Sequence, residues 1–203
     1  MIARTWRAIV RALFTLLLSR VAAERAPDFI VGADNPDGAY LLRWYLTRWR
    51  HWPAQAEANP TRLNRVKALV SPLLFNVYLH KFLRDDDDRA LHDHPWAWCS
   101  LLLDGRYIEH TIAAGGIHHR HPRSAGSMKF STPRRAHRIE LLPWPKSVMW
   151  PEVVDIGQPC WTLFITGPRM RRWGFHCPDA GWVDFTRFTK PDSTGETGAG
   201  CEG

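Results

Sequence analysis

The stretch Leu91-His92-Asp93-His94-Pro95-Trp96 indicates how this chain is built. Side chains alternate between the two faces of a β-strand, so a His-x-His pair on an extended segment directs both imidazoles to one face. Two neutral imidazoles on one face are half of a transition-metal site. We therefore expect the rest of the chain to supply a further ligand and a pocket around it.

The composition favours a single β-rich domain with an extra terminal arm. The chain has 203 residues, which is enough to bury a substantial core. Its 11 Trp, 15 Pro and 14 Gly residues favour short strands and turns over long helices. The net charge of +7 suits an acidic partner, which could be nucleic acid, an anionic membrane or an anionic small substrate. A basic domain with no such partner is the alternative.

The cysteines show no Cys-x-x-Cys spacing; they are Cys99, Cys160, Cys177 and Cys201. A chain of this size does not depend on a disulfide framework, as small secreted domains do. We therefore predict reduced thiols and a cytoplasmic location.

Residues 1–25 are expected to form a basic amphipathic helix. Apolar side chains recur there at steps of three and four residues, and arginines fall elsewhere on the helical wheel. These apolar positions are Ile2, Trp6, Val10, Leu13, Leu17 and Val21. Three interpretations are open: a signal peptide, a helix that lies on a membrane surface, and a helix that packs on the domain or on a partner. The apolar run from Ala12 to Leu18 is too short to span a bilayer.

Three parts are expected along the chain. Residues 1–70 form a helical or irregular arm, residues 71–190 a β-barrel, and residues 191–203 a flexible tail rich in Gly, Ser and Thr. Within the arm, the aromatic and basic segment 40–52 could stack on bases or could cover a core. Residues 53–70 are typical of a polar linker that leads into a short helix.

Short strands at regular spacing follow residue 72 and predict an all-β sandwich or barrel. The expected strands cover residues 73–83, 96–103, 106–112, 117–121, 126–130, 136–142 and 160–166. The acidic run from Asp85 to Asp88 lacks the alternating ligands and the glycine of a calcium loop, so a solvated turn is expected there.

The dipeptide Asp104-Gly105 predicts a two-residue hairpin turn. In that register Leu102 pairs with Tyr107 and Ser100 with Glu109, and paired residues share a face. If the strand runs unbroken from His94, this face also carries the two histidines. Glu109 is therefore a candidate carboxylate near the metal, unless Pro95 introduces a bulge that reverses the assignment.

A third imidazole has several candidates. His137 shares a strand face with Ile139 and Leu141, and an imidazole on such an apolar face fits a ligand inside a barrel. The other candidates are His176 and the cluster at residues 118–121, which follows a Gly-Gly turn and is typical of an exposed loop. His137 is the favoured third ligand.

Residues 73–185 resemble the cupin superfamily, a small jelly-roll barrel whose metal is held by a His-x-His motif and by a later motif with one His. His92 and His94 match the first motif, and Gly126, Pro133 and His137 match the second loosely. The cupin glutamate expected four or five residues after His94 is replaced by Trp98 and Cys99. The resemblance then implies either a three-histidine site, as in thiol dioxygenases, or a carboxylate from elsewhere, with Glu109 favoured.

Three longer stretches look like uncharacterised cupin-like proteins of bacteria and their phages. They are Asn76-Val77-Tyr78-Leu79-His80 with the His-x-His motif, residues 161–168, and Trp173-Gly174-Phe175-His176. This closer likeness implies the same fold and adds nothing about the reaction.

A site of three neutral imidazoles suits Fe(II), Mn(II), Ni(II), Cu(II) or Zn(II), and Fe(II) is favoured because oxygenase chemistry is expected. We predict a metal-dependent oxygenase that acts on a small molecule, which the basic charge allows to be anionic. Glu109 and Tyr107 are candidates for catalysis, and Arg106, Trp98 and Trp173 for substrate binding.

Two alternatives to an enzyme stay open. One is a cupin that binds a metal or ligand without turnover, as a sensor or an assembly component. The other is a basic protein that binds nucleic acid. A homodimer is implied by the family resemblance, because cupins often pair through sheet edges, and residues 1–25 offer a contact with a membrane surface.

Overall fold

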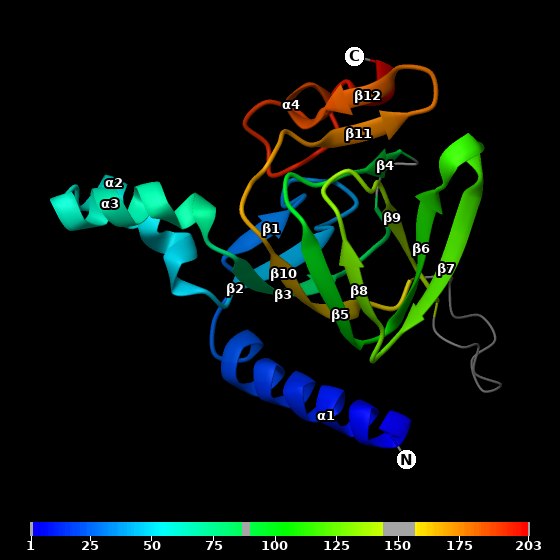
Figure 1. Ribbon diagram of the computed structural model, residues 1–203, viewed down its shortest axis with the longest axis horizontal. Coiled ribbons are helices and arrows are strands. Elements are labelled where there is room, and N and C mark those ends of the chain that lie inside the picture. The colour runs from blue at the N-terminus through cyan, green and yellow to red at the C-terminus, as the bar shows by residue number, and fades with distance from the viewer. Residues whose placement is uncertain (1, 87–89, 144–156, 203) are drawn as a thin grey trace.

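Short apolar strands that end at turns make up most of the structure (Figure 1). The computed structural model describes residues 2–86, 90–143 and 157–202. The strands are β1 (Phe29–Val31), β2 (Leu41–Tyr45), β3 (Asn76–Phe82), β4 (Leu91–His92), β5 (Trp98–Asp104), β6 (Arg106–Ile112), β7 (His118–Ser124), β8 (Met128–Ser131), β9 (Arg138–Leu141), β10 (Cys160–Thr166), β11 (Gly174–Cys177) and β12 (Gly181–Asp184). The α-helices are α1 (Ile2–Leu17), α2 (Trp52–Ala58), α3 (Arg62–Val70) and α4 (Phe185–Phe188). Short helical turns cover Leu18–Ala22, Arg48–His51, Ser71–Leu73, Ala114–Gly116 and Gly200–Glu202.

The strands form antiparallel sheets in two layers. The large sheet has the order β1-β2-β3-β10-β5-β8, and two smaller sheets have the orders β12-β11-β4 and β7-β6-β9. A bridge between His92 and His137 joins the two smaller sheets. One core cluster packs residues of the large sheet against Tyr107, Ile139 and Leu141 of the β7-β6-β9 sheet. The predicted β-rich double layer and the predicted N-terminal helix α1 are therefore present, although helices α2 and α3 add helical content that corrects the prediction of an all-β domain.

The large sheet begins inside the segment expected to be a separate arm. In β2, Leu41 pairs with Phe82 of β3, and both side chains are buried in the same core cluster. Trp44 of β2 is also buried, and its ring stacks on Trp161 at 5.5 Å between centroids. The division expected at residue 70 therefore does not follow the sheet, and the core interpretation of segment 40–52 is the one seen.

The hairpin predicted at Asp104-Gly105 is wrong. Strand β5 pairs with β8 and β10, whereas β6 pairs with β7 and β9, so the chain passes at Gly105 from one layer to the other. Gly105 has φ of +88°, and a Cβ atom there would lie 2.7 Å from the Cβ of Cys160. A glycine is therefore required at a corner between sheets, and the sequence signal for a corner resembles that for a hairpin turn.

The next predicted turn is confirmed. Strands β6 and β7 form an antiparallel hairpin in which Ile112 pairs with His118 and Arg106 with Ser124. The histidines at residues 118–121 therefore lie on a strand, as expected for residues 117–121, and the alternative of an exposed loop is wrong.

Helix α1 covers the outer face of the large sheet (Figure 1). Val10 is buried in a cluster with Trp44, Leu79 and Leu101 of the sheet. Leu13, Phe14, Leu17 and Val21 pack against the same cluster. The packed interpretation of residues 1–25 is thus the one seen, because the apolar side of the helix is used against the domain. None of the described helices has the length and apolar character that crossing a membrane requires.

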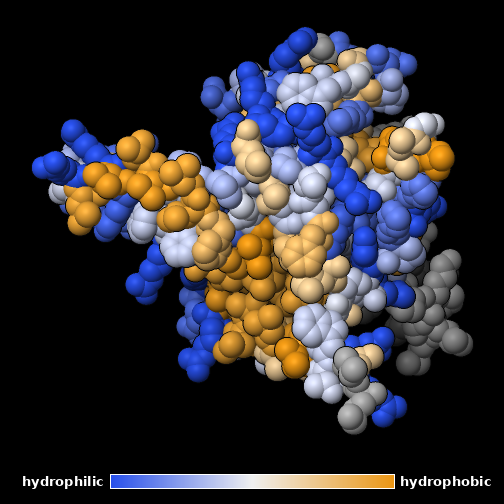
Figure 2. Space-filling model, in the orientation of Figure 1, coloured by the Kyte–Doolittle hydropathy of each residue, from blue (hydrophilic) through white to orange (hydrophobic). Residues whose placement is uncertain are grey.

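Helices α2 and α3 pack on one another and project from the body of the protein (Figure 1). They replace the polar linker expected at residues 53–70. Thr61 caps α3 by accepting a hydrogen bond from the backbone amide of Asn64. Leu63, Val66 and Leu69 lie exposed on α3 and form the apolar surface of the projection in Figure 2.

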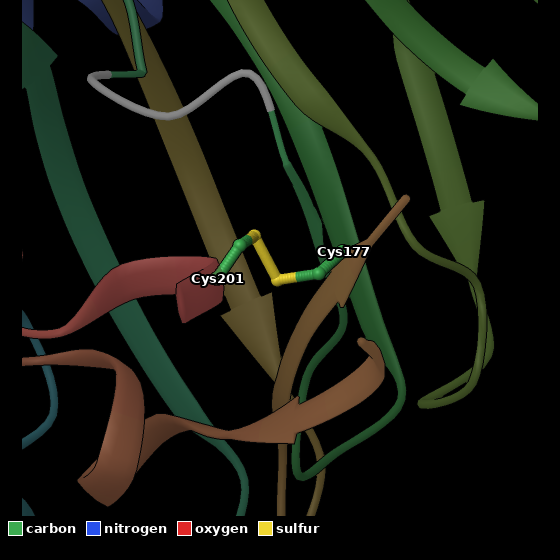
Figure 3. The surroundings of a disulfide bond; sticks show 2 residues. All are labelled: Cys177 and Cys201. Atoms are coloured by element: carbon green, nitrogen blue, oxygen red, sulfur yellow. A yellow bond between two sulfur atoms is a disulfide. The ribbon is translucent and has the colours of Figure 1, made fainter. Parts of the chain in front are cut away.

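The tail expected to be flexible is held on the domain. Cys201 forms a disulfide with Cys177 of β11 (Figure 3), which corrects the prediction of four reduced thiols. Backbone hydrogen bonds also join Lys190 to Glu196 and Phe188 to Gly198. The disulfide removes the basis on which a cytoplasmic location was predicted, because disulfides persist chiefly in oxidising compartments.

We expect the disulfide to stabilise the fold, because it closes a loop with a sequence separation of 24 residues. Loop-closure entropy then gives about 3 kcal/mol, which the double variant Cys177→Ser/Cys201→Ser should lose in urea unfolding. Cys99→Ser is the control, since Cys99 carries a free thiol outside the loop. Four reactive thiols in the unfolded, unreduced protein would contradict the disulfide, whereas its presence leaves two.

Candidate metal centre

Two of the three histidines are brought together by the backbone. The amide of His92 donates to the carbonyl of His137 at 2.9 Å, and the amide of His137 donates to the carbonyl of His92 at 2.9 Å. Directly opposed residues of an antiparallel pair project to the same face, so their imidazoles must lie side by side. Their ring centroids are 4.9 Å apart.

His94 completes the cluster from the segment between β4 and β5. Its amide donates to the carbonyl of Pro133 at 3.1 Å, which ties it to the segment that carries His137. The Nε2 atoms of His94 and His137 are 2.9 Å apart, and one ring nitrogen from each of the three histidines lies within 4.8 Å of the others. Two ligands bound at about 2.1 Å and at right angles are about 3 Å apart, so the three residues fit one metal ion.

Burial keeps the imidazoles of His92 and His94 neutral. It lowers the pKa of His92 to about 4, although the charge of Asp86 opposes the shift. Burial, followed by the neighbouring His137 and His92, lowers the pKa of His94 well below its ordinary value. Neutral imidazoles have the free lone pairs that a metal ion requires. The protein therefore presents the two side chains in their metal-binding form at neutral pH.

Glu109 lies behind His137 and is not a ligand, which corrects its predicted place beside the metal. Its Oε1 lies 3.0 Å from Nδ1 of His137, so Nδ1 is engaged in a hydrogen bond with the carboxylate. The other ring nitrogen of His137, Nε2, points toward His94. A carboxylate behind a ligating histidine fixes the tautomer and orientation of the ring. Among the described residues, the group that can hold an ion contains only the three histidines.

Glu109 is buried and fully paired. It is 1% exposed, it pairs with the ammonium group of Lys129, and Nη2 of Arg123 donates to its Oε2 at 3.0 Å. Burial alone would raise the pKa of Glu109, but the hydrogen bonds and charges of His137 and Lys129 outweigh it and lower the pKa. An ionised and triply engaged carboxylate is poorly suited to general-base catalysis, the role expected for it.

Glu109 reaches His137 by a different strand pairing from the predicted one. In β6 it lies opposite Ile139 of β9, two residues beyond His137 along the chain. The expected pairing of Glu109 with Ser100 does not exist, because Ser100 pairs with Phe164 and Lys129.

Asp93 faces away from its two histidine neighbours, as the alternation of a strand predicts. It is 1% exposed, and its carboxylate accepts hydrogen bonds from the amide of Gly174 at 2.9 Å and from Nε1 of Trp182 at 3.0 Å. Arg171 lies at 2.7 Å from the same carboxylate and His176 at 3.2 Å. Asp93 thus anchors β4 to β11 and β12, and it holds His176 outside the metal cluster.

Asp85 and Asp86 of the acidic run hold strand β9, whereas the sequence predicted only a solvated turn there. Asp85 accepts a hydrogen bond from the amide of Leu141, and Asp86 accepts one from the amide of Ile139, both at 2.6 Å. These carboxylates therefore accept hydrogen bonds from backbone amides at the edge of β9 that does not pair with β6. Asp87 and Asp88 lie outside the described residues.

The metal cluster opens into a cavity of about 390 Å³ between the two layers. Trp98, Tyr107 and Trp173 line it, as expected of pocket residues. Burial, followed by the charge of Glu109, raises the pKa of Tyr107, so its phenol stays protonated and can donate a hydrogen bond. Arg106 is exposed at the start of β6 and is not among the described residues that line the cavity, so the structure does not bring it together with the histidine cluster.

Two polar cavity residues were missed by the sequence reasoning. Arg43 of β2 and His80 of β3 lie opposite one another and both line the cavity. The alternation of side chains in β2 places Leu41, Arg43 and Tyr45 on one face, and this pattern could have pointed to Arg43. The pattern was not sufficient, because nothing in the local sequence shows that β2 pairs with β3.

Comparison with known proteins gives structural likeness without sequence likeness. No protein-family model and no curated protein sequence matches the chain. A cupin superfamily protein from Desulfitobacterium hafniense shares 10% identity over 63% of this chain and 77% of its own, with a TM-score of 0.36. The EutQ protein of Clostridium difficile shares 9% over 73% and 83%, with a TM-score of 0.40. A variant of Bacillus subtilis oxalate decarboxylase shares 16% over 50% of this chain and 24% of its own, with a TM-score of 0.35.

A cupin superfamily protein is among the solved structures that match the chain, which agrees with the predicted resemblance. The likeness to bacterial and phage proteins stays a prediction. At these identities and TM-scores, the functional argument rests on the side chains of this chain alone.

We expect Glu109→Gln to weaken metal binding about 10- to 100-fold, because it removes the charge that holds the ring of His137. Competition with a chromophoric chelator for Zn(II) measures the affinity. Glu140→Gln is the matched control, since Glu140 pairs with His110 and Arg120 on another face of the β7-β6-β9 sheet. Equal affinities of the Glu109→Gln and Glu140→Gln variants would show that Glu109 does not support the site.

Proposed function

We propose that this protein is a metal-dependent oxygenase acting on a small organic substrate in the cavity beside His92, His94 and His137. The convergence of three imidazole nitrogens at the wall of a cavity carries this proposal. A redox-active ion such as Fe(II), held by neutral imidazoles, supplies electron-transfer chemistry toward oxygen when it is bound.

The described wall of the cavity offers no free carboxylate for hydrolysis that depends on a protein base. Such hydrolysis needs a positioned base to activate water, unless a metal-bound hydroxide replaces it. Among the described residues that line the cavity, Asp86 is the only carboxylate, and it is occupied by the amide of Ile139. Glu109 is held by three partners behind His137.

The protein's own contribution is to position the ligands and to exclude water. Trp98 packs against both His94 and His137, at 5.4 Å and 4.9 Å between ring centroids. Phe164 packs against His94 from the large sheet at 6.0 Å. Aromatic walls of this kind place a substrate against the histidines and keep the surroundings of the site apolar.

The metal test uses full-length protein purified without a histidine tag. We expect about one equivalent of a divalent transition metal in the wild type and almost none in His92→Ala/His137→Ala, because each variant position removes a ligand. Elemental analysis measures the content, and His118→Ala/His119→Ala is the control, as these two histidines are exposed on β7. Metal retained by the first variant would show that the site is elsewhere.

Oxygen consumption separates an enzyme from a binding protein. The Fe(II)-loaded wild type should consume oxygen with a panel of small thiols and organic acids, and His92→Ala/His137→Ala should not. Tight metal binding without oxygen uptake across the panel would favour a sensor or assembly component. DNA binding that weakens with salt and survives loss of both histidines would favour the nucleic-acid alternative.

A further inference from the structure

Arg43 is a positively charged residue in the cavity that has no role in the histidine cluster described above. It lies on the inner face of β2, and it is the only Arg or Lys among the described residues that line the cavity. Its side chain is half-buried, and among the described residues it forms no ion pair with a carboxylate. A guanidinium group away from bulk water is costly unless an anion compensates it.

The surroundings of Arg43 fix it in one orientation. Its Nε donates to Nε2 of His80 at 2.9 Å. The guanidinium carbon lies 5.3 Å from the ring centroid of Tyr78 and 6.0 Å from that of Phe29. The terminal nitrogens Nη1 and Nη2 have no hydrogen-bond partner within the described chain. A guanidinium held by its Nε and its faces presents these two nitrogens as a fork, which matches a carboxylate.

His80 and Thr162 extend this feature. A guanidinium only donates, so Nε2 of His80 must accept and its Nδ1 must carry the proton. That Nδ1 and the Oγ1 of Thr162 are buried, and neither has a partner among the described residues. His80 pairs directly with Arg43 on one side and with Thr162 on the other. The inner face of the large sheet thus carries three adjacent residues with donor groups that lack acceptors.

This row lies one aromatic ring from the metal centre. The ring of Phe164 stacks on His80 at 5.1 Å between centroids and packs against His94 at 6.0 Å. A molecule that touches both Arg43 and the histidine cluster must therefore be short. The walls between them are mainly aromatic and aliphatic, with Phe82, Trp98 and Ile139 among the lining residues.

We propose that Arg43, oriented by His80 and with Thr162 beside it, is a carboxylate-binding subsite, and that the substrate is a small monocarboxylate with an apolar body. The inference rests on the proposed function, since it places the rest of the substrate toward His94. The cavity wall offers one guanidinium among its described residues, from Arg43, and it also contains the carboxylate of Asp86. We therefore expect a ligand that carries a single negative charge. A phosphate dianion would need further cations, which the described lining does not offer.

The test compares acids with their amides, which have almost the same shape and no charge. Benzoate and hexanoate are titrated calorimetrically against benzamide and hexanamide, using the full chain loaded with Zn(II), which supports no redox turnover. We expect the wild type to bind each acid about 10- to 100-fold more tightly than its amide, as a charged bidentate hydrogen bond requires. Arg43→Gln should lose this preference, and Arg43→Lys should retain part of it.

The same titration after removal of the metal separates Arg43 from direct binding of the acid to the ion. The preference should persist in the chelated wild type, because its origin is the guanidinium. Arg106→Gln is the control, since Arg106 is an exposed arginine outside the cavity and its loss should change nothing. Circular dichroism establishes that each variant is folded, and the neutral variant Arg43→Met replaces Arg43→Gln if the latter is not.

Each outcome bears on one proposal or the other. A preference for acids that vanishes in Arg43→Gln, with its metal content unchanged, supports the subsite. The inference is overturned if the wild type does not distinguish acids from amides, if the preference survives in Arg43→Gln, or if it disappears with the metal. A wild type that selects acids through Arg43 yet binds no metal would refute the proposed oxygenase and leave the subsite standing.

Discussion

The candidate site depends on one pair of backbone hydrogen bonds, those between His92 and His137. These bonds join the sheet that contains β4 to the sheet that contains β9, so the ligands belong to the framework and not to a loop. Once the two residues are opposed in an antiparallel bridge, their side chains share a face without further adjustment. His94 needs only one more backbone bond, to Pro133, to reach the same point.

The second requirement is electrostatic. Three imidazoles in a buried cluster must be neutral before they can bind a cation, and burial lowers the pKa of His92 and His94 accordingly. Glu109 then supplies a negative charge behind His137, where it polarises the ring and compensates the charge of a bound ion. That carboxylate is itself sustained in the interior by Lys129 and Arg123. The positive charges that hold Glu109 lie behind the histidines, so they do not compete with the metal for the lone pairs.

Local patterns predicted the ligands and failed on the pairing of distant segments. His92 and His94 follow from strand alternation, and His137 from an imidazole on an apolar strand face. Glu109 was identified as a neighbour of the site by a hairpin that does not exist, because a glycine at a corner between sheets and a glycine in a hairpin give the same signal. Arg43 was missed, since its position depends on β2 pairing with β3 across residues that form two helices. The disulfide was missed for the same reason: Cys177 and Cys201 lack a local motif, and only the folded tail brings them together.

The segments that composition marked as arm and tail are parts of the cavity. The arm supplies Phe29, Tyr40 and Arg43 to its wall. The tail supplies Thr194 and Gly195, and the backbone amide of Gly32 donates to the carbonyl of Thr194 at 3.3 Å, which joins the two segments. Residues 71–190 contain the three histidines, Glu109 and Lys129, whereas Arg43, the only Arg or Lys among the described cavity residues, lies outside them. The histidine cluster is therefore built by the barrel strands, and both ends of the chain complete the wall of the cavity beside it.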